Sequence, residues 1–275
     1  MSFADFVRRL FRGSAPPPMA GVNTAPSGDE TTRWQKALAD FGFPYIVVTS
    51  LEAEAALEAE RQVGQQEGYS PVIIFPGLWI STPATPAARI KRARGVPLDR
   101  YDAGFGRAFL ARKFAQLHQD LADDPECLDP AMFDDLQPIA AQSLSRGLHL
   151  HRKYNSATQS MEPVAEVAIM RIPTTDGDTI PVYLDWGGWN AAPSPLEICA
   201  VSRHWGETHG ARLIAIGSDT IEFTVARKPA THAAAVALLK EHCCFSRDIW
   251  ENDQGGMEQA AAQLRVSDTW FFWWD

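Results

Sequence analysis

The amino-acid sequence predicts an α/β fold of the α+β kind, with a largely antiparallel C-terminal sheet that carries helices on one face. Three observations predict this class. Short apolar runs such as residues 71–75 (PVIIF) have the length and β-branched character of strands. The segments between such runs begin at capping residues and end at glycine, as helices do. Finally, the chain closes on residues 270–275 (WFFWWD), whose aromatic side chains predict a docked last strand or a binding surface.

The composition indicates a sizeable core and an acidic charge. At 275 residues and 45% hydrophobic, the chain can form one large domain or two small ones. The formal charge of −9 argues against general affinity for nucleic acid or anionic membranes, which require an excess of Lys and Arg. No apolar run reaches the length of a membrane span, and no CxxC spacing suggests zinc. We therefore expect a cytoplasmic protein with reduced thiols and no cofactor.

The first 30 residues are expected to form a flexible extension and linker. Residues 3–12 place phenylalanines at helical spacing beside arginines, which suits a frayed extension, a partner-docking helix or a membrane-surface helix. Residues 13–30 are rich in Pro, Gly, Ser and Ala and show no periodicity. We expect an N-terminal α/β and helical region over residues 31–159 and a C-terminal α+β domain over residues 160–275.

A strand–helix–strand unit is predicted at the start of the N-terminal region. Residues 44–49 (PYIVVT) have the pattern of a buried strand, and Thr49 with Glu52 forms a potential capping box for the next helix. That helix is rich in Ala and Glu and is expected to end at Gly68, before the strand at residues 71–75. This order favours a parallel, right-handed crossover between the two strands.

Residues 83–150 are expected to be mostly helical, with breaks at prolines. Within them, the stretch 89–113 reverses the acidic character of the chain. Its charged residues are Arg89, Lys91, Arg92, Arg94, Arg100, Arg107, Arg112 and Lys113 against Asp99 and Asp102. We interpret the stretch as a solvated helix face or as a contact for a phosphate or an acidic partner.

The C-terminal region is predicted to begin with two antiparallel strands, residues 164–172 and 180–184, joined by a tight turn around Asp176 and Gly177. Ser194 is then a strong N-cap, since proline follows it and a glutamate completes a capping box.

That helix is expected to end at Gly210, and strands at residues 211–216 and 220–226 come next. Thr231 is predicted to cap a further helix, and residues 257–265 to form a short one before the aromatic tail.

The loop after the predicted strand at 180–184 is the main candidate for a binding site. Its glycines allow positive φ and close backbone approach, and its two indoles can hold a sugar or a peptide side chain, or can plug the end of the sheet. We group with it two residues of the following helix and the last residue of the chain. The candidate binding residues are Asp185, Trp186, Gly187, Gly188, Trp189, Asn190, His204, Trp205 and Asp275.

Carboxylates near the predicted strand ends offer a second kind of site. They are Asp176, Asp178, Asp185, Asp219, Glu222, Asp248, Asp253 and Asp275. Pairs of acids can bind a divalent metal or transfer protons, whereas acids in solvated turns do neither. If Asp185 or Asp275 is buried, we expect it to need a metal or an arginine partner. No nucleophile motif, phosphate-binding loop or dinucleotide fingerprint is present, so no catalytic or metal-binding residue is assigned.

Three blocks of the sequence resemble a known family. They are residues 181–190 (PVYLDWGGWN), Arg203-His204-Trp205 with Gly210, and the closing residues 270–275. In this order the blocks resemble the bacterial domain-of-unknown-function 4253 family over roughly residues 160–275. Ala192 stands where the family pattern has a cysteine, and Ser246 with Arg247 replaces a Cys-Pro pair. The resemblance implies domain limits and a bacterial origin, and it carries no activity.

The sequence thus favours a non-catalytic, protein-binding role, as an immunity-like or adaptor module for a bacterial partner protein. The alternative is a metal-assisted hydrolase or a small-ligand-binding protein that uses residues 185–190 and the strand-end carboxylates. Whether the protein is an enzyme stays open at this point.

Overall fold

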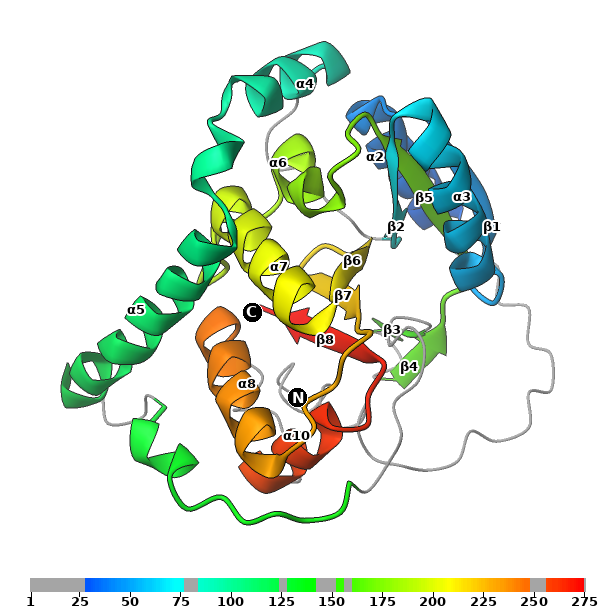
Figure 1. The fold of residues 1–275 in the computed structure, drawn as a ribbon. Coiled ribbons are helices and arrows are strands. Elements are labelled where there is room, and N and C mark those ends of the chain that lie inside the picture. The colour runs from blue at the N-terminus through cyan, green and yellow to red at the C-terminus, as the bar shows by residue number, and fades with distance from the viewer. Residues whose placement is uncertain are drawn as a thin grey trace.

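The fold is given by a computed structural model of the chain (Figure 1). It describes residues 28–76, 84–123, 128–141, 152–155, 160–247 and 256–274. The amphipathic segment 3–12, most of the predicted linker and Asp275 lie outside the described residues, so the expectations placed on them stay predictions. None of the described helices is both long enough and apolar enough to cross a membrane.

The described parts of the chain contain both helices and strands. The helices are α2 (Gly28–Phe41), α3 (Ala53–Glu67), α4 (Pro86–Gly95), α5 (Ala103–Asp123), α6 (Ile180–Leu184), α7 (Pro195–His209), α8 (His232–Phe245) and α10 (Gly256–Leu264), with short 3-10 turns η1 (Leu98–Arg100), η2 (Pro130–Phe133) and η4 (Gly177–Thr179). The strands are β1 (Tyr45–Thr49), β2 (Ser70–Ile74), β3 (Arg152–Asn155), β4 (Ser160–Pro163), β5 (Glu166–Ile172), β6 (Arg212–Ile216), β7 (Thr220–Thr224) and β8 (Thr269–Trp273).

Six strands form one mixed sheet in the order β1-β5-β2-β6-β7-β8. Only β2 and β6 pair in parallel, and the other neighbouring strands of this sheet are antiparallel. β3 and β4 form a separate antiparallel pair. A mostly antiparallel sheet with helices packed on it confirms the predicted α+β class.

The middle of the sheet combines strands from both halves of the chain. β2 lies between β5 and β6, with Val72 opposite Met170 on one side and Ile73 opposite Ala215 on the other. β1 and β2 each run antiparallel to β5, so they are parallel to one another, as the crossover prediction required. They are not neighbours, however, because β5 is inserted between them. One sheet therefore spans the ranges 31–159 and 160–275.

Two hydrophobic cores lie on opposite faces of this sheet. Successive strand residues point to opposite faces, so Ile73 and Ile74 belong to different cores. α3 supplies Leu57 to the smaller core, and the larger core lies under the other helices, including α7 and α8 (Figure 1). α5 forms an outer layer against α7. Gly106 permits this close approach, because a Cβ there would lie 2.1 Å from the carbonyl oxygen of Ala200.

Strand β1 differs from the buried strand that the sequence predicted. It lies at the edge of the sheet, and its side chains alternate between exposed and partly buried. The capping box predicted at its end is also wrong. α3 has Glu52 as N-cap without a side-chain cap, and the Thr49 hydroxyl instead donates to the Glu52 carboxylate over 2.6 Å. The predicted end of α3 is confirmed, since Gly68 adopts φ of 82° there.

The segment 180–184 is a helix, which corrects the strand that its apolar run predicted. Five consecutive apolar residues suit either a buried strand or a buried turn of helix, and periodicity does not distinguish them. Local signals favour the helix, because Pro181 lies in its first turn and the 3-10 turn η4 leads directly into it. Asp176 therefore does not form a hairpin turn. It caps η4, and its side chain accepts a hydrogen bond from the Asp178 N–H over 3.1 Å.

The remaining C-terminal elements confirm the prediction. α7 begins with the capping box of Ser194 and Glu197 and ends at Gly210, whose φ is 62°. The Thr231 side chain caps α8 by accepting from the Ala234 N–H over 3.1 Å. The aromatic tail docks as β8, which pairs antiparallel with β7 at the edge of the sheet. Its ring contacts explain the composition of the tail, since Phe272 is fully buried and stacks on Trp205 with centroids 5.2 Å apart.

Candidate functional site

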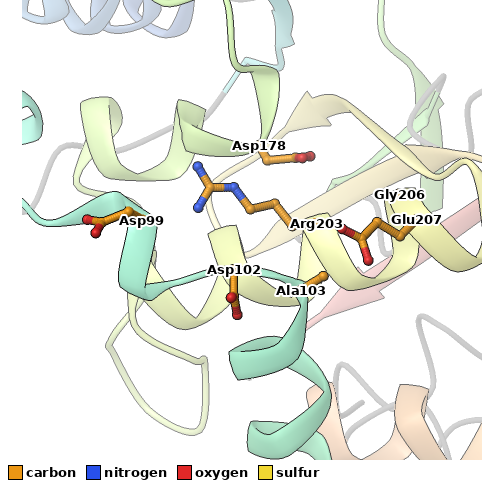
Figure 2. Close-up of a pocket in the computed structure, with 7 residues that line it drawn as sticks. All are labelled: Asp99, Asp102, Ala103, Asp178, Arg203, Gly206 and Glu207. Carbon is orange, nitrogen blue, oxygen red and sulfur yellow. The ribbon is translucent and has the colours of Figure 1, made fainter.

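A solvent-open pocket of about 460 Å³ lies where the turn before α5 meets α7. Figure 2 shows its lining, in which the Arg203 side chain extends between the turn that carries Asp178 and the segment that carries Asp99. The lining residues are Asp99, Asp102, Ala103, Asp178, Arg203, Gly206 and Glu207. Four of these seven residues carry carboxylates and one carries a guanidinium, so the pocket has a negative character.

Arg203 uses its guanidinium on the protein itself. Its Nη1 atom donates to the carbonyl oxygens of Leu98 at 2.6 Å and Tyr101 at 2.7 Å. Its Nη2 atom donates to the Asp176 carboxylate at 2.6 Å. Burial opposes the charge of Arg203, but the bond to Asp176 offsets it and the pKa of the guanidinium is raised. Arg203 therefore ties η1 and η4 to α7, and its ion pair is made with Asp176, which is not one of the lining carboxylates.

Asp178 is the carboxyl of the pocket with the most altered acidity. It follows Asp176 by two residues in the turn that leads to α6. Burial raises the pKa of Asp178 to about 7, and the negative charge of Asp176 adds to this effect while Arg203 opposes it. Close to neutral pH the carboxyl therefore changes between its neutral and charged forms. Asp102 has a structural task, because its Oδ1 atom accepts from the Phe105 N–H over 2.8 Å at the start of α5.

The predicted tryptophan loop is built mainly into the core. The Trp186 indole is buried and donates to the Gly217 carbonyl over 2.9 Å. It makes edge contacts with Trp189 at 4.8 Å and with Trp274 of the tail at 5.7 Å. The tail and the loop thus meet, as far as the described residues reach. Trp189 is only partly buried and remains accessible at this place.

Positive backbone φ angles shape this loop. Gly187 has φ of 111°, and a Cβ there would lie 2.5 Å from the Pro193 carbonyl oxygen. Gly188 has φ of 80°, and the non-glycine residues Asp185 and Asn190 also take positive values. The glycines are therefore needed for the path of the chain, whether or not a ligand binds. The binding role of the loop stays a prediction.

Asp185 has the arginine partner that the sequence prediction allowed for. It forms an ion pair with Arg92 of α4. Beside it, Arg89 is buried and donates to the Leu184 carbonyl over 2.9 Å, with its guanidinium 5.1 Å from the Phe41 ring. The basic stretch 89–113 is thus not solvated throughout, since these two arginines hold α4 against the C-terminal end of α6.

His204 and Trp205 of α7 share one carboxylate. Glu241 of α8 accepts from the Trp205 indole at 2.7 Å and lies 3.1 Å from the His204 Nε2 atom. Next to them, His242 is buried among aromatic rings, with Trp270 at 4.6 Å. Burial lowers the pKa of His242 well below its ordinary value, and His209 adds to this. A neutral, buried imidazole suits packing here.

The predicted candidate residues thus separate into places with different surroundings. Asp185 is paired with Arg92 and Trp186 is in the core, whereas His204 and Trp205 are linked to α8. Aromatic contacts connect the two places through Phe245, which touches both Trp205 and Trp274. Asp275 follows Trp274 and lies outside the described residues.

The tail, the loop and the Trp205 cluster correspond to the three blocks of the resemblance. Residues 168–275 match the family described as Domain of unknown function (DUF4253). No curated protein and no solved structure matches the chain. We refer to residues 168–275 as the DUF4253 region.

The pocket joins the DUF4253 region to the segment before it. Asp178, Arg203 and Glu207 belong to the DUF4253 region, whereas Asp99 and Asp102 come from the turn before α5. Sequence reasoning noted Asp178 only as one of several turn acids and overlooked Arg203 as a functional residue. The two acids on either side of Gly177 could have indicated a site here. Nothing in the local sequence showed that Arg203 would bind one of them.

Nucleophiles and metal sites have little support among the described residues. The Cys199 and Cys244 thiols are buried, and burial raises the pKa of each to about 12. A thiol with such a pKa is a poor nucleophile at neutral pH. Within the described ranges, no group of three His, Cys, Asp or Glu side chains is arranged to hold a metal ion.

Proposed function

We propose that the protein is a non-catalytic, protein-binding module whose acidic pocket receives a basic side chain of its partner. The single observation that carries the proposal is the pocket at Arg203. Its carboxylates face a space open to solvent, and its one guanidinium already has three acceptors within the protein. A cation from a second protein would supply the missing positive charge.

The spacing and chemistry of the pocket favour an organic cation. A metal ion needs oxygen ligands that converge within about 2.0–2.6 Å of one point. The acids of the pocket form no such group among the described residues. A guanidinium or an ammonium group donates several hydrogen bonds over a wider area, so separated carboxylates can share it.

The acidic charge and the lack of catalytic motifs in the sequence indicate the kind of partner. An acidic module with no catalytic motif suits an immunity-like or adaptor role in the bacterial cytoplasm, directed at a bacterial partner protein. Such complexes gain association rate from complementary charge, and the formal charge of −9 would attract a basic partner.

A capture experiment with matched variants tests the proposal. The tagged full-length chain is used to recover partners from a bacterial lysate, and binding of the recovered protein is then measured with purified components. We expect the triple variant Asp99→Asn, Asp102→Asn, Glu207→Gln to bind at least about tenfold more weakly, which corresponds to about 1.4 kcal/mol. Asparagine at 102 can still cap α5, so the variant is expected to fold.

The control variant makes the same change of charge at exposed acids far from the pocket in sequence. It carries Glu58→Gln, Asp134→Asn and Asp135→Asn, all of which are exposed. We expect it to bind as the wild type does. If the wild type recovers no specific protein, or if both triple variants bind equally well, the proposal is wrong.

A further inference from the structure

The free edge of strand β1 is the part of the described surface where exposed apolar side chains gather. Tyr45 and Val47 are 36% and 45% exposed, Leu51 in the turn that follows is 77% exposed, and Val63 of α3 is 40% exposed. Figure 1 places β1 and α3 together at one end of the molecule, away from α5 and α7. Soluble monomers usually protect an edge strand with lysine, proline or a bulge. β1 has none of these between Tyr45 and Thr49.

The backbone of β1 shows which residues face this edge. Pro44 accepts from the Arg171 N–H, and Ser50 donates to the Ala165 carbonyl, so the even-numbered residues direct their hydrogen-bonding groups toward β5. Backbone groups alternate in direction along an antiparallel strand. The N–H and C=O groups of Tyr45 and Val47 therefore point away from the sheet, where no described strand pairs with them. Thr49 directs its groups the same way, and its C=O also accepts from the Glu52 N–H over 3.0 Å in the turn that follows.

This edge is complementary to itself. If two β1 strands pair antiparallel about a two-fold axis at Val47, then Val47 lies opposite its own copy and Tyr45 lies opposite Thr49. Each matched pair exchanges two backbone hydrogen bonds, and the side chains that meet are apolar or β-branched. The chain carries a formal charge of −9, but residues 41–51 contain no charged side chain. Two copies can thus approach here without placing like charges directly opposite one another.

Helix α3 does not contribute to this edge. It packs mainly over β2 and β5, on the face toward which Ile46 and Val48 point, whereas Tyr45 and Val47 point to the other face. A contact between two copies at this edge therefore rests on β1.

We propose that two copies of this chain associate through β1, so that their six-stranded sheets join into one continuous sheet through an antiparallel β1–β1 pairing. This association does not depend on the pocket at Arg203, which lies in another part of the fold.

Mass measurement on the full-length chain tests the association. By light scattering or sedimentation over about 1 to 100 μM, we expect the wild type to approach twice its chain mass of 30.3 kDa. Val47→Lys places a charge opposite its own copy and is expected to weaken dimerisation at least about tenfold. Val47 is exposed, so the unfolding temperature of this variant should stay near the wild-type value.

Two further variants show where the contact lies. Ile139→Lys changes an equally exposed apolar residue outside the surface and should leave the dimer intact. Val47→Cys should form a covalent dimer on mild oxidation, since paired residues of a hydrogen-bonded antiparallel pair have Cα atoms about 5.5 Å apart. A wild-type chain that stays monomeric over the whole concentration range would overturn the proposal. So would a dimer that tolerates Val47→Lys, or one that Val47→Cys does not cross-link.

Discussion

Asp178 shows how a single residue can be altered by its place in the fold. In the sequence it is a turn aspartate, but the fold partly buries it near Asp176, and its pKa is raised from 3.8 to about 7. Arg203, the nearest cation, is committed to Asp176 and to two backbone carbonyls. The folded protein therefore keeps Asp178 protonated at pH values where the unfolded chain has lost that proton.

The raised pKa makes the stability of the protein depend on pH. A carboxyl whose pKa is raised by folding stabilises the folded protein fully below about pH 4, and this stabilisation is lost as the pH rises through 7. The change Asp178→Asn removes this loss. We expect the free energy of unfolding of the variant, relative to that of the wild type, to rise by on the order of 1–2 kcal/mol as the pH goes from 5 to 8.

Chemical denaturation of the variant and the wild type at pH 5 and at pH 8 measures this change. The exposed Asp134, which is 71% exposed, provides the control change Asp134→Asn and should show no such gain. An equal effect of Asp178→Asn at pH 5 and pH 8 would show that Asp178 titrates normally in the folded protein.

At the scale of elements, two helix starts that look alike in the sequence differ in the structure. Ser194 and Thr49 each precede a glutamate three residues later. At Ser194 both halves of the capping box form, with the Ser194 N–H donating to Glu197 over 2.8 Å. At Thr49 the chain leaves an edge strand through a turn, α3 starts at Ala53, and the threonine hydroxyl bonds only the Glu52 side chain.

This difference predicts unequal costs for two similar substitutions. Ser194→Ala removes a helix cap and should lower the free energy of unfolding by about 1 kcal/mol. Thr49→Ala removes only an exposed side-chain contact and should cost less than about half of that. Urea denaturation of both variants measures the two costs side by side. Equal losses would mean that Thr49 caps α3 in solution after all.

At the scale of the whole molecule, the insertion of β2 between β5 and β6 ties the two halves together. Residues 160–275 supply β5, β6, β7 and β8 of this sheet, but β5 and β6 do not pair with one another, because β2 lies between them. The family match at 168–275 therefore covers a segment whose sheet is completed by residues from outside it. The pocket, too, is completed by residues from outside this segment, because Asp99 and Asp102 precede the DUF4253 region.

The inserted strand predicts that a fragment of residues 160–275 does not fold alone. Without β2, the apolar residues Met170, Ile172 and Ile216 lose their partners in the middle of the sheet. Two unpaired strand edges then promote aggregation. Circular dichroism and two-dimensional NMR of the fragment measure this, with residues 28–275 as the folded control. A soluble fragment with dispersed amide signals would instead support an autonomous domain with the boundary expected from the sequence.

Features that depend on neighbours along the chain could be predicted from the sequence. The caps at Ser194 and Thr231 and the stop at Gly210 act through hydrogen bonds within one helical turn, so the local sequence was enough to find them. The aromatic segment 270–274 was also predictable as a docked strand, because exposing so much apolar area to water is costly. The α+β class followed from these elements together.

Features that depend on residues far apart in the chain could not be predicted from the sequence. The run at 180–184 is apolar enough for a strand or a helix. In the fold it forms a helix that packs against α4 and α7. The place of β2 depends on strand pairing across about 100 residues, which no local pattern records. Arg203 reaches Leu98 and Asp176 only because α7 lies between η1 and η4. Local sequence specifies backbone hydrogen bonding over a few residues, whereas long-range packing places the pocket and sets its charge.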